Sequence, residues 1–146
     1  MDGAWKRPES VLVVVFTAAG DVLLLDRVAP AGFRQSVTGS LEPGETADAA
    51  ARRELLEETG IDAVPEDLGE TIEYEIRPEW RSRYAPGVTV NREHLFAVEL
   101  EAPVAVRTDP AEHVRAEWVA REAALGAVFS ATNRAAIERL VPAAGG

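Results

Sequence analysis

The sequence contains no cysteine, only two histidines, and 15 basic residues against 25 acidic ones. Without cysteine the chain has no disulfide, no thiolate metal ligand and no cysteine nucleophile, and this composition agrees with the cytoplasmic location that we expect. Two histidines argue against a zinc site built on paired imidazoles. The formal net charge of -10 disfavours binding to nucleic acid, because nonspecific binding depends on cationic contacts to phosphates.

The sequence also lacks any long hydrophobic run. No stretch of about 18 apolar residues is present, so we predict no membrane-spanning helix and no membrane partner. The first residues show no signal-peptide pattern. The chain has 146 residues, of which 47% are hydrophobic, and this is enough for one globular domain with a sizeable core. We therefore expect a single domain over residues 1–146.

Apolar periodicity and turn residues predict a mixture of strands and helices. Strands are expected at 10–17, 22–25, 34–38, 69–77, 94–100 and 114–119, with a hairpin between the first two, a connector at 65–68 and a loop at 78–87. Helices are expected at 46–59, 123–128 and 131–140, and Ser130 is the predicted N-cap of the last. This pattern predicts an α/β fold in which a mixed β-sheet is sandwiched between helices, an α/β/α sandwich.

The helix predicted at 46–59 carries three glutamates on one face. Glu54, Glu57 and Glu58 are related by i, i+3 and i+4, so their carboxylates lie side by side and repel one another. Small apolar residues share that side: Ala47, Ala50 and Ala51. The face is therefore predicted to meet the protein body, where crowded carboxylates need a counter-charge. Mg²⁺, or alternatively Mn²⁺, supplies one, because such cations bind carboxylate and phosphate oxygens.

The loop before this helix contains Gly39, Pro43 and Gly44, which favour a sharp turn that brings backbone atoms close to a metal. Glu45 ends the loop, and Arg53 is available on the helix to form an ion pair with it. We interpret this pair as structural, because it fixes the loop against the helix.

The whole segment from Gly39 to Ile61 fits one spacing, G-x5-E-x7-R-E-U-x-E-E-x-G-U, in which U is an aliphatic residue. The fixed positions are Gly39, Glu45, Arg53, Glu54, Glu57, Glu58 and Gly60, and Leu55 and Ile61 fill the aliphatic positions. At an average usage of about 6% per residue, seven such identities coincide with a probability on the order of 10⁻⁹ per start position. The chain resembles the Nudix hydrolases at every signature position, and the predicted sandwich agrees with the Nudix fold.

Outside this segment the chain resembles one subgroup, the dihydroneopterin triphosphate pyrophosphohydrolases. Short segments carry the resemblance: residues 6–8, 35–40 and 83–88, Glu112-His113, and the tail at Ser130, 133–134 and 136–138. The subgroup often has an aromatic residue at the position of Arg34, so this chain departs from the pattern there. We predict that Arg34 contacts a phosphate instead.

The resemblance implies roles for particular residues. Metal ligands would be Glu54, Glu58, Glu112 and Gly39. Substrate contacts would come from Lys6, Arg27, Thr38, Tyr74, Glu75, Ile76, Arg77 and Ser130. Glu57 or Glu54 would activate the attacking water, and the sequence does not separate the base from the ligand within this cluster. The implied reaction is Mg²⁺-dependent hydrolysis of dihydroneopterin triphosphate to the monophosphate and pyrophosphate, a step in folate biosynthesis.

Two alternatives remain open at this point. The chain is either a nucleotide-pool-sanitising or dinucleotide polyphosphate Nudix hydrolase, or a catalytically silent module that binds a nucleotide. Silent modules usually lose signature carboxylates, and this chain keeps all of them. We expect a small-molecule triphosphate as partner, and the sequence leaves monomer and homodimer open.

Overall fold

The computed structural model describes residues 5–28, 33–108, 111 and 113–143. Its elements are, in order, β1 (Glu9–Thr17), β2 (Asp21–Arg27), β3 (Arg34–Gln35), β4 (Val37–Ser40), α1 (Ala47–Thr59), β5 (Glu66–Glu75), a 3₁₀ helix (Pro78–Arg83), β6 (Val90–Leu100), β7 (His113–Ala120), α2 (Arg121–Ala127) and α3 (Ala131–Leu140). None of the helices in these residues is long and apolar enough to span a membrane.

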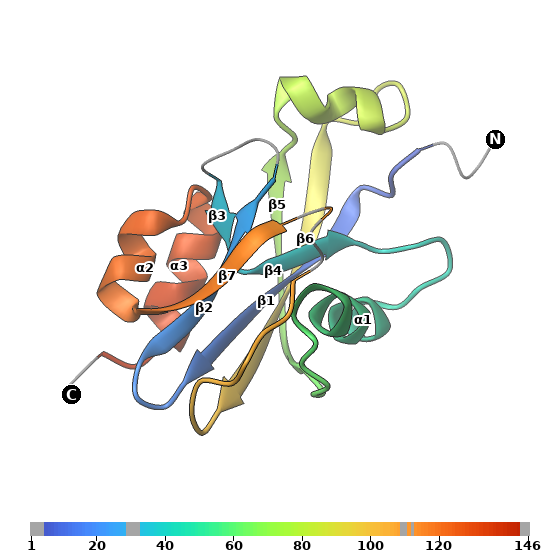
Figure 1. Ribbon diagram of the computed structural model, residues 1–146. Helices are drawn as coiled ribbons and strands as arrows, with labels where there is room; N and C mark the ends of the chain where they lie inside the picture. The colour runs from blue at the N-terminus through green and yellow to red at the C-terminus, as the bar shows by residue number, and fades with distance from the viewer. Residues whose placement is uncertain (1–4, 29–32, 109–110, 112, 144–146) are drawn as a thin grey trace.

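A seven-stranded mixed sheet is organised around β1 (Figure 1). β1 runs parallel to β6 along its whole length and antiparallel to β4 from Ser10 to Val13, but it pairs with β2 only near their turn, at Phe16 and Val22. β2 pairs with β7 along its whole length and with β3 near its end. The predicted hairpin is therefore present and opens away from its turn, so β4 and the end of β2 line a common space.

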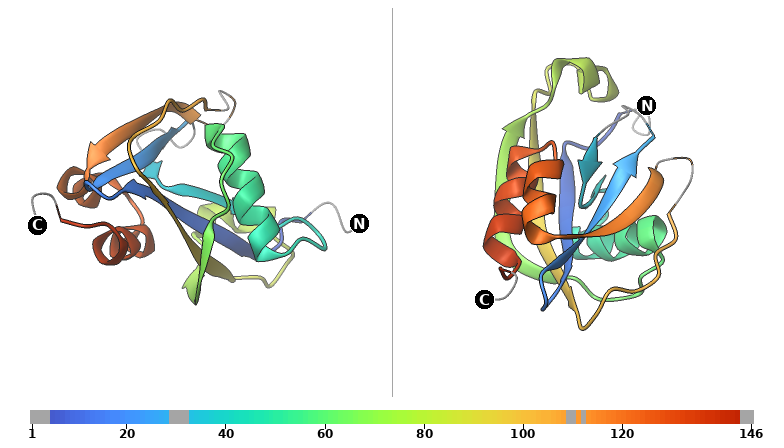
Figure 2. Two further views of the ribbon diagram at one scale, coloured as in Figure 1. Left: turned by 90° about the horizontal axis from the view of Figure 1, so that it is seen from below. Right: turned by 60° about the vertical axis from the view of Figure 1, so that its left-hand side comes forward.

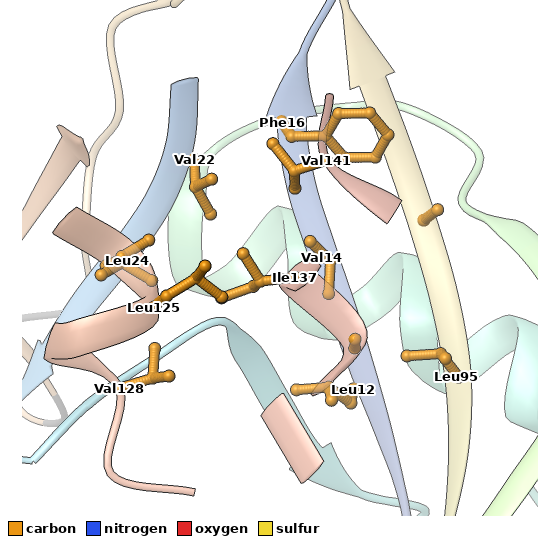
Figure 3. Packing of buried hydrophobic residues seen from close by; sticks show 13 residues of the cluster. Leu12, Val14, Phe16, Val22, Leu24, Leu95, Leu125, Val128, Ile137 and Val141 are labelled. Atoms are coloured by element: carbon orange, nitrogen blue, oxygen red, sulfur yellow. The ribbon is translucent and has the colours of Figure 1, made fainter. Parts of the chain in front are cut away.

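Helices cover both sides of the sheet, with α1 on one side and α2 and α3 on the other (Figure 2). Alternate residues of β1 point to opposite faces of the strand. Val11, Val13 and Val15 pack into a cluster with Leu55 of α1. Leu12, Val14 and Phe16 pack into a second cluster with Ile137 of α3 (Figure 3). Burial on both faces explains the uninterrupted apolar run in β1 and confirms the predicted α/β/α sandwich.

Local signals define both ends of α1. The Thr46 hydroxyl accepts a hydrogen bond from the Ala49 backbone N–H at 3.2 Å, which makes Thr46 the N-cap. Gly60 adopts φ 77°, a left-handed conformation that glycine tolerates, and its N–H donates to the Leu56 carbonyl oxygen at 2.9 Å. One side of the helix buries Ala50, Ala51, Leu55, Glu58 and Thr59. The prediction that the alanine side meets the protein body is confirmed.

The structure corrects several boundaries, among them the start of the strand predicted at 94–100, which begins at Val90. The predicted strand at 34–38 is interrupted at Ser36, whose N–H donates to the Asn133 side chain at 2.8 Å and leaves the strand pairing. The predicted connector at 65–68 was wrong from Glu66 onward, because the long β6 pairs with Glu66 and Asp67 before a register shift that includes Gly69. The predicted loop at 78–87 begins with the 3₁₀ helix Pro78–Arg83.

Candidate active site

A cleft of about 550 Å³ lies where β4, α1 and the end of β2 meet. We call it the main cleft, and its walls include Lys6, Arg27, Thr38, Gly39, Arg53, Glu54 and Tyr74. Lys6, the only lysine of the chain, places its ammonium 5.8 Å from the centre of the Tyr84 ring. Cationic and anionic groups therefore share this cleft.

The Arg53 guanidinium is the centre of the acidic part of the cleft. It donates to both carboxylate oxygens of Glu45 at 2.8 Å, so the expected ion pair is present and bidentate. It also donates to Glu54 at 2.8 Å, to Glu57 at 3.0 Å and to the Ser40 carbonyl oxygen at 3.2 Å. This hydrogen bonding lowers the pKa of Glu45 and raises the pKa of Arg53. One side chain thus joins the loop, β4 and the helix.

Glu54 packs against the backbone of β4. A Cβ atom at Gly39 would clash with the carboxyl carbon and both carboxylate oxygens of Glu54, so only glycine allows this approach. Burial raises the pKa of Glu54 to about 7, the nearby Glu58 and Glu57 charges add to the increase, and Arg53 opposes it. The carboxylate is therefore held in a place where its negative charge is only partly compensated.

The three helix glutamates have different surroundings. Glu58 is 3% exposed on the buried side of α1, whereas the Glu57 side chain is 50% exposed and bound to Arg53. Glu54 lies between these extremes and lines the main cleft. The sequence placed all three on one face, but only the structure separates the buried carboxylate from the exposed one.

The donor chemistry at α1 fits a hard divalent cation. Glu54 and Glu58 offer carboxylate oxygens, and the absence of a side chain at Gly39 opens the β4 backbone toward Glu54. Within the described ranges no three carboxylate or imidazole side chains form a ready cation cluster. Mg²⁺ commonly binds through one or two carboxylates, waters and substrate phosphates, so such a cluster is not required. The predicted ligand Glu112 lies outside the described residues.

A second pocket, of about 310 Å³, adjoins the main cleft. Gln35, Thr38 and Tyr74 line both spaces. Three further predicted substrate residues line the second pocket: Glu75, Arg77 and Ser130. The Ser130 hydroxyl also caps α3, as predicted, by accepting from the Asn133 N–H at 3.2 Å. The structure thus brings together seven of the eight predicted substrate residues: Lys6, Arg27, Thr38, Tyr74, Glu75, Arg77 and Ser130.

Ile76 is the exception. Its side chain is 3% exposed and lines neither space. Its N–H donates to the Thr89 carbonyl oxygen at 2.8 Å, and its own carbonyl oxygen accepts from Arg81 at 2.9 Å. The backbone of Ile76 therefore makes hydrogen bonds within the protein and its side chain is buried, because the chain passes from β5 to the 3₁₀ helix at this point.

Arg34 does not line either space. Its guanidinium donates to Asp26 at 2.6 Å and to Glu117 at 2.7 Å, because β3 pairs with β2 and places Arg34 opposite Asp26. These ion pairs replace the predicted phosphate contact. The neighbouring Phe33 supplies the aromatic surface instead: its ring stacks on Phe129 at a centroid distance of 4.2 Å.

Sequence reasoning missed several residues of the second pocket, and Glu93 is the charged one among them. This glutamate is 5% exposed in β6, and burial raises its pKa to about 7. Asn91, Glu93 and Leu95 are all buried, which is the alternation of a strand with one inward face. The predicted strand began at His94, so this signal was not used.

Comparisons with known proteins agree with this geometry. A family model described as the NUDIX domain matches residues 6–141. Dihydroneopterin triphosphate diphosphatase of Escherichia coli K12 is 44% identical over 96% of this chain and 96% of its own length. The protein of the same name from Haemophilus influenzae is 38% identical over 92% of this chain and 88% of its own. The structure of the E. coli dihydroneopterin triphosphate pyrophosphohydrolase superposes with a TM-score of 0.87 at 42% identity, covering 94% of this chain and 97% of that chain.

The chain belongs to the Nudix family and is a hydrolase acting on a diphosphate bond. Within the family it is similar to dihydroneopterin triphosphate diphosphatases over nearly its whole length. The subgroup resemblance that rested on short segments is confirmed.

We expect Arg53→Ala to lower both stability and activity. The substitution removes charge-assisted hydrogen bonds from three glutamates, and the expected loss in the free energy of unfolding is about 2 kcal/mol. Arg52→Ala is the matched control, because the exposed Arg52 makes a single ion pair with the exposed Asp62. Urea unfolding and turnover are measured on both variants. Lost activity with unchanged stability would show that Arg53 acts on the substrate instead of the fold.

We also expect Glu93→Gln to stabilise the protein in a pH-dependent way. The pKa of Glu93 is about 7 in the folded protein against an ordinary value of 4.5, so the folded state favours the neutral acid. The contribution of Glu93 to the free energy of unfolding is fully present below pH 4.5 and is lost as the pH rises through 7. The advantage of the glutamine variant should therefore grow from pH 5 to pH 8, to at most about 3 kcal/mol.

The neighbouring Tyr74 stays neutral over this range, since burial raises its pKa to about 12. Glu99→Gln, an exposed position on the same strand, serves as control and should show no such trend. A difference between Glu93→Gln and wild type that stays constant from pH 5 to pH 8 would contradict the assignment.

Proposed function

We propose that this protein is a Mg²⁺-dependent Nudix pyrophosphohydrolase that converts dihydroneopterin triphosphate to the monophosphate and pyrophosphate. The observation that carries the proposal is the pair of adjoining spaces. The main cleft combines Glu54 with Lys6 and Arg27, and the second pocket opens from it at Thr38 and Tyr74. One space suits a chain of phosphates and the other a single organic ring. The similarity to the E. coli and H. influenzae diphosphatases supports this substrate.

The residues divide into phosphate binding, metal binding and water activation. Lys6 and Arg27 would bind phosphate oxygens, and Glu54 and Glu58 would hold Mg²⁺, together with Glu112 by resemblance. When bound, Mg²⁺ would neutralise charge on the phosphates and on these carboxylates. A water oxygen bonds to the phosphorus next to the organic moiety, the bond from that phosphorus to the bridging oxygen breaks, and pyrophosphate leaves. The water proton passes to a glutamate carboxylate.

Two glutamates are candidates for that base. Glu54 has a pKa of about 7, close to the operating pH, which suits proton transfer. Glu57 is half exposed and is held by Arg53, so it remains available when Glu54 binds the cation. We retain Glu54 and Glu57 as alternative candidates for the general base. We also propose a cytoplasmic location and a single catalytic domain over residues 1–146.

Glu58→Gln should lower turnover at least about 100-fold, the scale expected when a major electrostatic contribution is lost. The substitution keeps the buried shape and removes one of three crowded charges, so the melting temperature should not fall. Turnover is measured across a Mg²⁺ titration, with the exposed Glu101→Gln as control. Near-wild-type turnover at saturating Mg²⁺ would refute the role of Glu58 as a metal ligand.

The substrate is tested by comparing kcat/KM for dihydroneopterin triphosphate with the values for dATP, 8-oxo-dGTP and a diadenosine polyphosphate. The pterin should be best, because a pocket that hydrogen-bonds one ring leaves polar groups unpaired with another. Product identification should give the monophosphate and pyrophosphate. If any of the other three is hydrolysed more efficiently, the pterin assignment fails while membership of the Nudix family stands.

A further inference from the structure

The second pocket contains a carboxylate that the hydrolysis itself does not use. Glu93 lies in the interior of β6, opposite Ser10 of β1, and is 5% exposed. The Ser10 hydroxyl donates to it at 3.3 Å, and the nearby Thr132 and Thr38 hydroxyl groups also lower its pKa, against the larger effect of burial. Among the described residues no cationic side chain forms an ion pair with this carboxylate. A buried acid surrounded by hydroxyl groups is costly to ionise unless a ligand supplies further donors.

The neighbours of Glu93 form a supporting network. The Asn91 side-chain amide donates to the Ser10 hydroxyl at 2.8 Å and to the Tyr74 hydroxyl at 3.1 Å. Tyr74 lines both the second pocket and the main cleft. The orientation of the Glu93 carboxylate is therefore linked, through Ser10 and Asn91, to a side chain at the junction of the two spaces.

The remaining walls suit a flat ring. Leu12 and Phe129 give the second pocket apolar surface, and Phe33 stacks on Phe129 and holds its ring in place. A volume of about 310 Å³ lies at the small end of the range for ligand sites, which is roughly 300–1,000 Å³. Such a pocket takes one ring system, while attached phosphates extend into the main cleft past Thr38 and Tyr74.

An ionised carboxylate has only acceptors and takes two parallel N–H bonds well. A 2-amino-4-oxopyrimidine edge, the edge that pterins share with guanine, presents a ring N–H beside an amino N–H. We propose that Glu93 determines ring specificity by accepting these two N–H bonds, an inference that rests on the proposed function. The pKa of about 7 agrees with this role, because two arriving donors stabilise the ionised form and shift the acid to its carboxylate.

The test isolates the amino group. Wild type and Glu93→Gln are assayed with Mg²⁺ on dihydroneopterin triphosphate, GTP, ITP, which lacks the 2-amino group, and inorganic tripolyphosphate, which has no ring. Wild type should prefer GTP over ITP by on the order of 10-fold, as substrates or as competitive inhibitors where turnover is slow. Glu93→Gln should reduce kcat/KM for the pterin by on the order of 10- to 100-fold, mainly through KM, and should bring GTP and ITP within about threefold. Tripolyphosphate hydrolysis should change less than about threefold, since it does not use the second pocket.

Two further variants keep the test decisive. Glu99→Gln, on the exposed part of β6, should leave every ratio unchanged. Glu93→Asp keeps the carboxylate and should retain part of the preference for GTP over ITP, which also decides the question if the glutamine variant does not fold. The proposal is overturned if Glu93→Gln lowers all activities equally or leaves the GTP-to-ITP ratio unchanged. A wild-type enzyme that prefers another triphosphate to the pterin defeats the proposed function, while the GTP-to-ITP ratio still tests Glu93.

Discussion

The contact between the Arg53 guanidinium and its carboxylates is the interaction on which the rest of the site depends. Arg53 holds Glu45 at the end of the loop, Glu54 and Glu57 on its own helix, and the Ser40 carbonyl oxygen of β4. Without a cation at this point, the carboxylates of Glu54, Glu57 and Glu58 on α1 would repel one another with nothing between them to offset it. Arg53 only partly offsets the burial and the Glu58 and Glu57 charges that together raise the pKa of Glu54 to about 7. The negative charge that Arg53 leaves uncompensated would attract a divalent cation.

The same arrangement explains how an acidic protein binds an anionic substrate. The formal net charge of -10 repels a triphosphate at long range. The main cleft opposes this with the only lysine of the chain and with Arg27 and Arg83, while its Arg53 is engaged by glutamates. In the proposed function, a divalent cation held by the helix glutamates would supply further positive charge beside the phosphates. Affinity for substrate and for Mg²⁺ should therefore be linked.

The sequence predicts most reliably what local interactions determine. The ends of α1 follow from Thr46 and Gly60, and the pairing of Arg53 with Glu45 connects residues on adjoining segments. Contacts between residues far apart in the chain could not be predicted from the sequence. Arg34 finds Glu117, 83 positions away, and Ser36 leaves its strand for Asn133, 97 positions away. The polar residues at the start of β5 gave no strand signal, because the partner strand β6 decides their conformation. Glu93 was missed for the same reason, since its burial depends on Ser10 and Thr132 of distant elements.

Glu54 and Glu93 are both largely buried carboxylates, and burying a carboxylate costs free energy. In the proposed function the first would bind a metal and the second the organic ring. Burial raises the pKa of each to about 7, but the neighbours differ. Glu54 lies beside other carboxylates and an arginine, where a metal cation gains most from the local field. Glu93 lies among hydroxyl groups, where neutral N–H donors can approach without repulsion from a cation. If Glu54 holds the metal and Glu93 binds the ring as proposed, both sites would be less favourable when empty than when filled, and stability given up in the free protein would be recovered when metal and substrate bind. A ligand that satisfies only one of the two carboxylates recovers only part of that stability, and this favours a substrate carrying both a phosphate chain and a donor-rich ring.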